Sequence, residues 1–171
     1  DEEKVSAACG QIDISLRYQD GVQQVILNGR DVSGKIRTEA VGNAASVVSA
    51  YRAVRQALLA LQQNLAMTSN VIMDGRDIGT CVLPHAQTKI YLTASSHVRA
   101  IRRYKELTEK GQMCNLEEIE QDIIDRDYRD MHREIAPLTQ AADAVLLDSS
   151  EMTIDQVVDG IIGAARERGL A

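Results

Sequence analysis

The chain has no tryptophan or phenylalanine, and only two prolines and three cysteines among its 171 residues. Its five tyrosines are too dispersed to form a platform on which nucleic-acid bases could stack. No apolar run approaches the ~18 residues that a membrane-spanning helix needs, and no signal-peptide pattern occurs. These absences argue against a membrane protein and against a binder of single-stranded nucleic acid.

The few cysteines also exclude two kinds of stabilising site. Cys9, Cys81 and Cys114 are far apart in the sequence and form no Cys-x-x-Cys pair, so neither a zinc site nor a disulfide framework is supported. The three histidines have no metal-ligand spacing either. We therefore expect free thiols in a reducing cytoplasm.

The charge balance limits the possible partners. Nineteen basic and 25 acidic side chains give a net charge of −6, which argues against a protein that coats nucleic acid with a basic face. Small anionic ligands remain possible, because they need only a few well-placed arginines. Length and composition fit one globular domain, or one core with a small insert.

The chain begins with Asp1-Glu2-Glu3 rather than with methionine. We expect that an N-terminal segment was removed or that these residues are a fragment of a longer protein.

The first part of the chain predicts a small antiparallel unit followed by two helices. Residues 12–19 alternate between apolar and polar, and Asp20-Gly21 is a turn signal before a second strand at 23–27. From Thr38 a helix is predicted. A second follows at about 52–66, where apolar residues recur at the spacing of one helix face.

The rest of the chain alternates between short apolar runs and helical segments. Buried strands are predicted at 71–73, 89–93 and 144–148, and helices at about 97–110, 116–133 and 154–168. This order is typical of an α/β fold with a parallel sheet and crossover helices.

A loop rich in glycine and aspartate follows the predicted strand at 71–73. It has the sequence DGRDIGT, residues 74–80. Open α/β sheets bind ligands at the carboxyl ends of their strands, and the fork of Arg76 suits a phosphate. The alternative is an ordinary turn with a surface ion pair.

A second group of charges lies in the helix predicted at 116–133. Arg126, Asp130 and Arg133 have the spacing of one helix face, and Arg129 is close by. Such a face could hold the phosphate and ribose of a nucleotide, but a solvated face held by ion pairs shows the same pattern. The basic residues from Arg99 to Lys105, as well as Arg55 and Ser46, are unremarkable by themselves.

Together these segments resemble the bacterial cytidylate kinase family. The match rests on DVSGKIRTEAVGNAAS (31–46), DGRDIGT (74–80), KIYLTAS (89–95), IIDRDYRDMHREIAPL (123–138) and ADAVLLDSSEMTIDQVV (142–158), in family order. The resemblance implies an α/β fold, the P-loop nucleoside monophosphate kinase core. Its five-stranded parallel sheet would be incomplete here. Residues 1–66 would form the monophosphate-binding insert. Residues 67–171 would form the C-terminal part of the core, with a short lid at about 104–120.

The resemblance also implies roles for individual residues. Ser46, Arg55 and Asp77 would contact the cytosine edge, and Arg76 and Arg133 would hold the CMP phosphate. Arg126 and Asp130 would face the ribose, Arg129 would contribute to substrate binding, and Arg99, Arg102 and Arg103 would lie on the ATP side. Catalytic roles would fall to Arg76, Arg126, Arg133 and Arg103, because arginines neutralise charge on the transferring phosphoryl group. Asp74 would help order Mg²⁺ indirectly.

The implied reaction transfers a phosphoryl group from ATP, with Mg²⁺, to CMP and also to dCMP. However, the 171 residues contain no Gly-x-x-x-x-Gly-Lys-Ser/Thr loop to hold the β- and γ-phosphates. We therefore expect these residues alone to be inactive and poorly stable, with the missing N-terminal peptide as a possible partner. Two alternatives stay open, namely a non-catalytic module that binds cytidine nucleotides and a kinase that prefers UMP.

Overall fold

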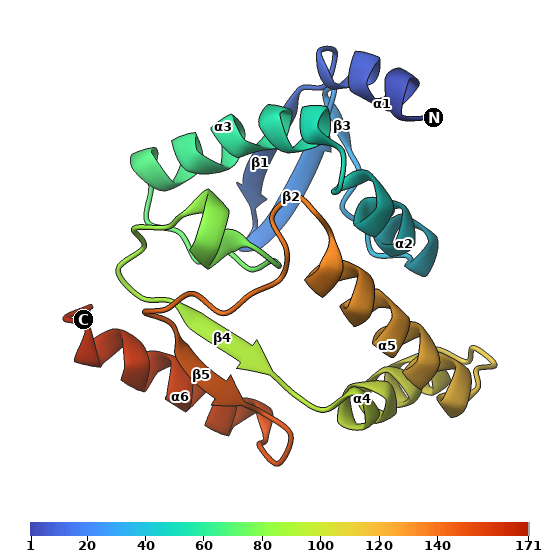
Figure 1. Ribbon diagram of the computed structural model, residues 1–171, viewed down its shortest axis with the longest axis vertical. Coiled ribbons are helices and arrows are strands. Elements are labelled where there is room, and N and C mark those ends of the chain that lie inside the picture. Colours follow the sequence, from blue (N-terminus) through green and yellow to red (C-terminus); the bar gives the residue numbers. More distant parts are fainter. Residues whose placement is uncertain (171) are drawn as a thin grey trace. The chain divides into compact units, whose positions relative to one another are not determined.

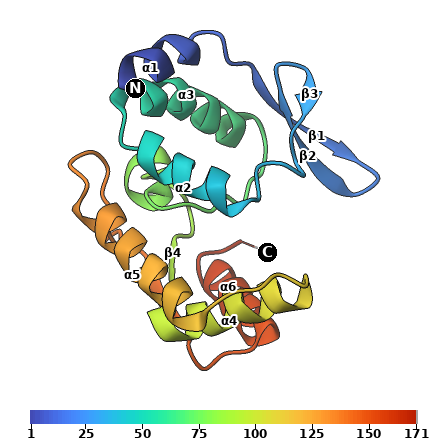
Figure 2. The ribbon, with the colours of Figure 1, turned by 90° about the vertical axis from the view of Figure 1, so that its right-hand side faces the viewer.

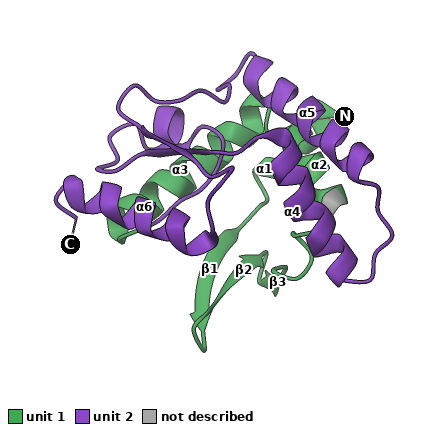
Figure 3. Ribbon diagram, turned by 90° about the horizontal axis from the view of Figure 1, so that it is seen from below, with its two compact units in different colours: residues 1–71 green, residues 72–171 purple. Residues whose placement is uncertain are grey.

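The computed structural model describes residues 1–170 and divides into two compact units, Asp1–Val71 (unit 1) and Ile72–Ala171 (unit 2) (Figure 3). Among the described residues, no helix is both long enough and apolar enough to cross a membrane. The roles of the two parts as insert, core and lid remain predictions.

Unit 1 contains a three-stranded antiparallel sheet in the order β1-β2-β3. The strands are β1 (Ile14–Gln19), β2 (Val22–Leu27) and β3 (Arg30–Asp31). The two connecting turns are Asp20-Gly21 and Asn28-Gly29, and all four residues have positive φ. Asp-Gly and Asn-Gly favour such two-residue hairpin turns, which confirms the predicted antiparallel unit.

Three helices complete unit 1, namely α1 (Glu2–Cys9), α2 (Glu39–Val48) and α3 (Arg52–Thr68). The Thr38 side chain caps α2 by accepting a hydrogen bond from the Val41 amide, 3.4 Å away. Helix α1 was not predicted from the sequence. It is capped by the side chain of Asp1 and contacts α3 (Figure 2). The contact with α3 therefore stabilises a helix that the local sequence pattern indicates only weakly.

Unit 2 is built on two parallel strands, β4 (Ile90–Thr93) and β5 (Val145–Asp148), paired from Ile90 with Val145 to Thr93 with Asp148. Between them the chain forms α4 (Ser96–Glu109) and α5 (Leu116–His132), which pack against each other, and α6 (Ile154–Glu167) follows beside β5 (Figure 1). The predicted α/β class with a parallel sheet is confirmed.

Ser95, Asn115 and Thr153 cap the three helices of unit 2 with their side chains, as their positions in the sequence indicate. Gly160 lets α6 approach β5 closely, because an added Cβ there would lie 3.3 Å from Leu147 Cδ1. The capping side chains thus fix where α4, α5 and α6 begin.

Two local predictions in unit 2 were wrong. Residues 71–73 are not a strand, and Ile72 is fully exposed. A strand needs a neighbour, and β4 and β5 pair only with each other among the described residues. In addition, the loop at 74–80 runs into a short π-helix, η1 (Ile78–Val82), a rare element that is frequent at functional sites.

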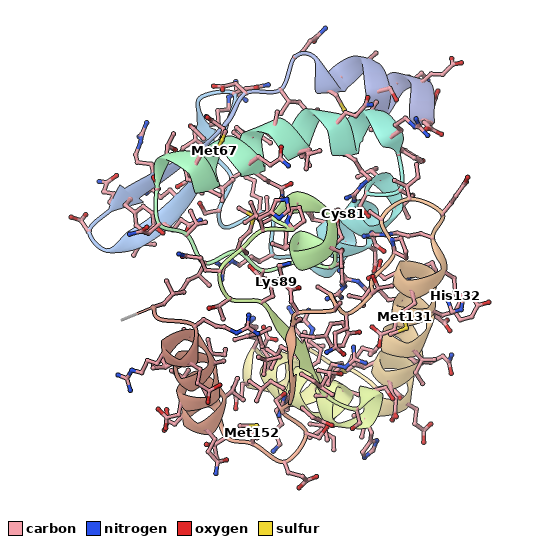
Figure 4. All side chains as sticks on the ribbon, turned by 60° about the vertical axis from the view of Figure 1, so that its left-hand side comes forward. Met67, Cys81, Lys89, Met131, His132 and Met152 are labelled. Carbon is pink, nitrogen blue, oxygen red and sulfur yellow. The ribbon has the colours of Figure 1, made fainter. Side chains whose placement is uncertain are left out.

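The start of β4 is tied to the start of β5 by the buried side chain of Lys89 (labelled in Figure 4). Its Nζ donates to a carboxylate oxygen of Asp143 at 2.9 Å and to the carbonyl of Pro84. The hydrogen bond from Lys89 holds the pKa of Asp143 below its ordinary value. This ion pair therefore depends on pH.

We expect acid to weaken unit 2 partly through this carboxylate. A carboxylate whose pKa is lowered in the folded state stabilises the fold fully at a pH above its ordinary pKa of about 3.9. This stabilisation is lost as the pH falls through the lowered pKa of the folded state. The thermal unfolding midpoint of the chain should therefore fall between about pH 5 and pH 2. Asp143→Asn should make that fall shallower. An equally steep fall in Asp143→Asn would contradict the assignment, and Asp13→Asn, at a carboxylate with no such lysine, is the control.

Candidate functional site

The DGRDIGT segment forms a tightly folded corner at the start of unit 2. The Asp77 carbonyl accepts hydrogen bonds from the amides of Thr80, Cys81 and Val82, at 3.3, 2.8 and 3.3 Å. This triple acceptance winds the chain into η1, which carries Cys81 (Figure 4). The corner therefore fixes the backbone of Asp77, whose side chain is buried with 8% of the residue exposed.

One glycine of this segment is required by space. A Cβ at Gly75 would lie 2.8 Å from Ile78 Cγ1, too close for any other residue without movement. At Gly79 a Cβ would lie 3.4 Å from Cδ of Lys89, an ordinary van der Waals contact. The stem of the buried lysine therefore packs against the corner at Gly79, and packing accounts for the glycine at position 75.

The last turn of α5 supplies a buried carboxylate that serves several arginines. Asp130 is 3% exposed and accepts a hydrogen bond from Nε of Arg76 at 2.8 Å. Arg126 Nε and Arg133 Nη1 each lie 3.9 Å from its carboxylate oxygens. Arg126, Asp130 and Arg133 thus meet in a single cluster, but the predicted common helix face is wrong for Arg133, which follows the end of α5 and has an extended backbone.

Arg133 connects this carboxylate with the DGRDIGT corner. Its Nη2 lies 3.6 Å from Oδ1 of Asp77, and its side chain is 9% exposed. Its Nε donates to the carbonyl of Ala136 at 2.7 Å. Sequence reasoning missed Ala136, since an alanine gives no signal that its carbonyl holds an arginine.

We call Arg76, Asp77, Arg126, Asp130 and Arg133 the arginine cluster. Three guanidinium groups and two carboxylates leave one net positive charge, if all are ionised. The Nε–H of Arg126 is buried and has no hydrogen-bond acceptor among the described residues. Buried donors are nearly always hydrogen-bonded in folded proteins, and a bound ligand would provide the acceptor that this Nε–H lacks. The cluster therefore has the charge and the donors to bind an anion.

The other charged candidates of unit 2 lie outside this cluster. Arg99 forms a bidentate pair with Asp127, Arg102 donates to the Ser149 carbonyl and hydroxyl, and Arg103 pairs with Glu106 at 2.8 Å. Arg129 and Asp74 are exposed. Arg99 thus joins α4 to α5, and Arg102 joins α4 to the residues that follow β5.

The candidates in unit 1 are connected to one another by hydrogen bonds through Ser49. Nη1 of Arg55, on α3, donates to the Ser49 carbonyl at 3.4 Å, and the Ser49 hydroxyl donates to the Ser46 carbonyl at 2.8 Å. Ser46 lies on α2 and Ser49 is its C-terminal cap. Ser49 was not singled out from the sequence, although it connects the two residues that were.

A family model described as cytidylate kinase matches residues 1–167. The chain belongs to the cytidylate kinase family. It is 46% identical over 160 residues to cytidylate kinase 1 of Haemophilus influenzae, covering 94% of this chain and 69% of that protein. It is also 46% identical over 167 residues to the cytidylate kinase of Klebsiella pneumoniae, covering 98% and 74%. It is 48% identical over 158 residues to the cytidylate kinase of Leuconostoc mesenteroides, and the alignment covers 92% of this chain and 70% of that protein.

Membership of the cytidylate kinase family makes the chain part of a group of nucleoside monophosphate kinases, enzymes that use ATP. Its α/β architecture with a parallel sheet is consistent with the P-loop nucleoside monophosphate kinase fold. The recognition drawn from the sequence motifs is thereby confirmed. The matched relatives are longer than the aligned region, since it spans 69–74% of their lengths.

A metal ion would find no three-residue ligand group here, because no cluster of three His, Cys, Asp or Glu side chains forms among residues 1–170. Mg²⁺ at phosphoryl-transfer sites is usually held by one or two carboxylates together with the substrate phosphates. Asp74, exposed just before the corner, offers one such carboxylate. This donor set fits a metal that arrives with a nucleotide.

Proposed function

We propose that this chain is part of an enzyme that transfers the γ-phosphoryl group of ATP to CMP, giving CDP and ADP, with dCMP as a second acceptor. The observation that supports it most is the arginine cluster, in which Arg76 and Arg133 are held by their Nε atoms. Holding an arginine at Nε directs its Nη1–Nη2 end, the fork that binds phosphate oxygens in pairs.

The proposed chemistry relies on position and charge. The 5′-phosphate of CMP would lie against Arg76 and Arg133, which orient its oxygen for in-line attack on the γ-phosphorus. Little covalent chemistry is required of the protein, because the transition state is stabilised mainly by fixed positive groups. We assign Arg126 and Arg103 the same neutralising task during transfer.

Further residues are proposed to contact the base and the ribose of CMP. Ser46, Arg55 and Asp77 would contact the cytosine edge, where a carboxylate can accept from the amino group that uracil lacks. Arg126 and Asp130 would face the ribose, and a ribose hydroxyl would provide the acceptor for the buried Nε–H of Arg126. Arg129 is proposed as an outer contact to the nucleotide.

On the ATP side we propose Arg99 and Arg102, with Mg²⁺ ordered indirectly through Asp74. When bound, the metal would neutralise charge on the ATP phosphates. A glycine-rich loop must also hold those phosphates, and none of the 171 residues forms one. We propose that it belongs to another segment of the same protein, and that these residues alone bind CMP without turning it over. The three free thiols fit a cytoplasmic location.

Titration calorimetry on the 171-residue chain tests the acceptor specificity. We expect CMP to bind at least about tenfold more tightly than UMP, because the Asp77 carboxylate can accept a hydrogen bond from the amino group of cytosine but would face the carbonyl oxygen of uracil. Cytidine should bind far more weakly than CMP, since it lacks the phosphate. Tighter binding of UMP would instead support a UMP kinase, and equal binding of CMP and cytidine would contradict the role of the arginine cluster.

The transfer step needs its own experiment. The 171-residue chain and a version extended by a glycine-rich N-terminal segment should be assayed for ADP formation from ATP and CMP. We expect turnover only in the extended version. CMP binding without turnover in the extended version would favour a non-catalytic module, and full turnover by the pure 171-residue chain would contradict the proposed need for the loop.

A further inference from the structure

The segment after α5 contains a strained residue that contacts the arginine cluster. Ala136 has φ +49°, in the left-handed region that an alanine rarely adopts. It also precedes Pro137, and a following proline narrows the allowed conformations further. Within residues 1–170, the other two non-glycine residues with positive φ are Asp20 and Asn28, both in hairpin turns where such a conformation is ordinary.

The strained conformation is held by hydrogen bonds at both ends of a short loop. The Ala136 carbonyl accepts from Nε of Arg133 at 2.7 Å, and the Leu138 amide donates to the Asp130 carbonyl at 2.8 Å. One bond returns to Asp130 in the last turn of α5, and the other returns to Arg133, the residue that follows the helix. A conformation that costs energy persists only where its surroundings determine it, and such residues concentrate at functional sites.

The direction of the Ala136 carbonyl has a consequence for Arg133. This arginine follows the last residue of α5, so its backbone is already extended, with φ −66° and ψ 144°. Its ion pairs with Asp77 and Asp130 measure 3.6 and 3.9 Å, longer than hydrogen bonds. The bond to the Ala136 carbonyl is therefore the shortest of these three contacts, and it holds the guanidinium group at Nε.

We propose that Ala136 is a positioning residue. Its left-handed backbone aims a carbonyl at Nε of Arg133, so that the Nη1–Nη2 edge faces the phosphate of the nucleotide. The inference rests on the proposed function for the identity of the ligand, but the link between Ala136 and Arg133 is independent of it. The segment Arg133–Leu138 has the sequence REIAPL. We infer that this segment fixes the orientation of the Arg133 side chain before the ligand binds.

Ala136→Val in the 171-residue chain tests the proposal, because a β-branched residue strongly disfavours positive φ. We expect its affinity for CMP to fall about tenfold, equivalent to about 1.4 kcal/mol. Affinity for cytidine should change less than about twofold, since cytidine carries no phosphate for Arg133 to bind. Ala136→Gly, which adopts positive φ without strain, should rescue most of the CMP affinity.

Two further variants separate positioning from a general loss of stability. Asp20→Val places the same side chain at φ 52° in an exposed turn, and it should leave the CMP-to-cytidine ratio unchanged. In an Arg133→Met background, Ala136→Val should add almost nothing to the loss of CMP affinity, because its effect acts through Arg133. Additive losses, or equal losses for CMP and cytidine, would overturn the proposal.

A second measurement needs no ligand. The Nε–H signal of Arg133 in a nitrogen-15 NMR spectrum should be protected from exchange with water in the parent chain and in Ala136→Gly, but exposed in Ala136→Val. If the parent chain does not bind CMP, the proposed function fails while this test still applies. A signal that is unprotected in the parent chain or in Ala136→Gly would overturn the role of Ala136, even if the valine variant does not fold.

Discussion

Asp130→Asn is expected to lower the free energy of unfolding by about 3–5 kcal/mol, because it removes the buried counter-ion that three arginines share. Asp130 is 3% exposed, and three arginines of the cluster lie within 3.9 Å of its carboxylate. An amide keeps the shape of the side chain and removes the charge that offsets them. A loss of this size consumes much of the stability of an ordinary domain.

Urea denaturation at neutral pH measures this effect. Glu106→Gln is the matched control, since Glu106 also pairs with two basic side chains, Arg103 at 2.8 Å and Lys110 at 2.6 Å, but at the surface. We expect little change for the control because water screens exposed pairs. Equal denaturation midpoints for the two variants would show that burial of Asp130 does not matter.

Arg76→Met is expected to weaken CMP binding on the order of 100-fold or more, because two charge-assisted hydrogen bonds to phosphate contribute about 1.5–3 kcal/mol each. The side chain of Arg76 is 40% exposed while its Nε is fixed by Asp130, so the variant should remain folded. Cytidine should bind as well as it does to the parent chain. Arg76→Lys should recover only part of the loss, since an ammonium group has no planar fork.

Calorimetry with CMP and cytidine measures both affinities on the same samples. Arg17→Met is the control, since it removes one positive charge at an exposed residue of β1 that is not a member of the cluster. A similar loss of CMP affinity in Arg17→Met would indicate attraction by net charge alone. Unchanged CMP affinity in Arg76→Met would remove Arg76 from the phosphate site.

The parts of the fold that the sequence predicted are those with local causes. The two hairpin turns follow from Asp20-Gly21 and Asn28-Gly29, and α4 ends just before Gly111, which has φ +72°. These features depend on a few adjacent residues whose backbone preferences are strong. For the same reason the helix limits were predicted within a few residues.

The features that could not be predicted depend on distant contacts. An apolar run at 71–73 has the composition of a strand, but pairing decides whether it becomes one, and none of the described residues pairs with it. The π-helix at Ile78–Val82 follows from the Asp77 carbonyl taking three donors, which no spacing reveals.

The candidate site divides in the same way. Helical spacing placed Arg126, Asp130 and Arg133 on one face, but their meeting with Arg76 and Asp77 spans more than 50 residues and was implied only by family resemblance. Ala136 carried no signal, since its role comes from a backbone angle. Residues that act through their side chains could be recognised in the sequence, whereas a residue that acts through its backbone carbonyl could not.

The parallel pairing of β4 with β5 also has a consequence for the order in which unit 2 folds. Ile90 pairs with Val145, and Arg76 bonds Asp130 across a sequence separation of 54 residues. The α4–α5 pair is local and can form early, whereas closing these long loops costs chain entropy before any contact compensates for it. We therefore expect the cluster to be assembled among the last events of folding, so that a chain that is still folding lacks the proposed phosphate site.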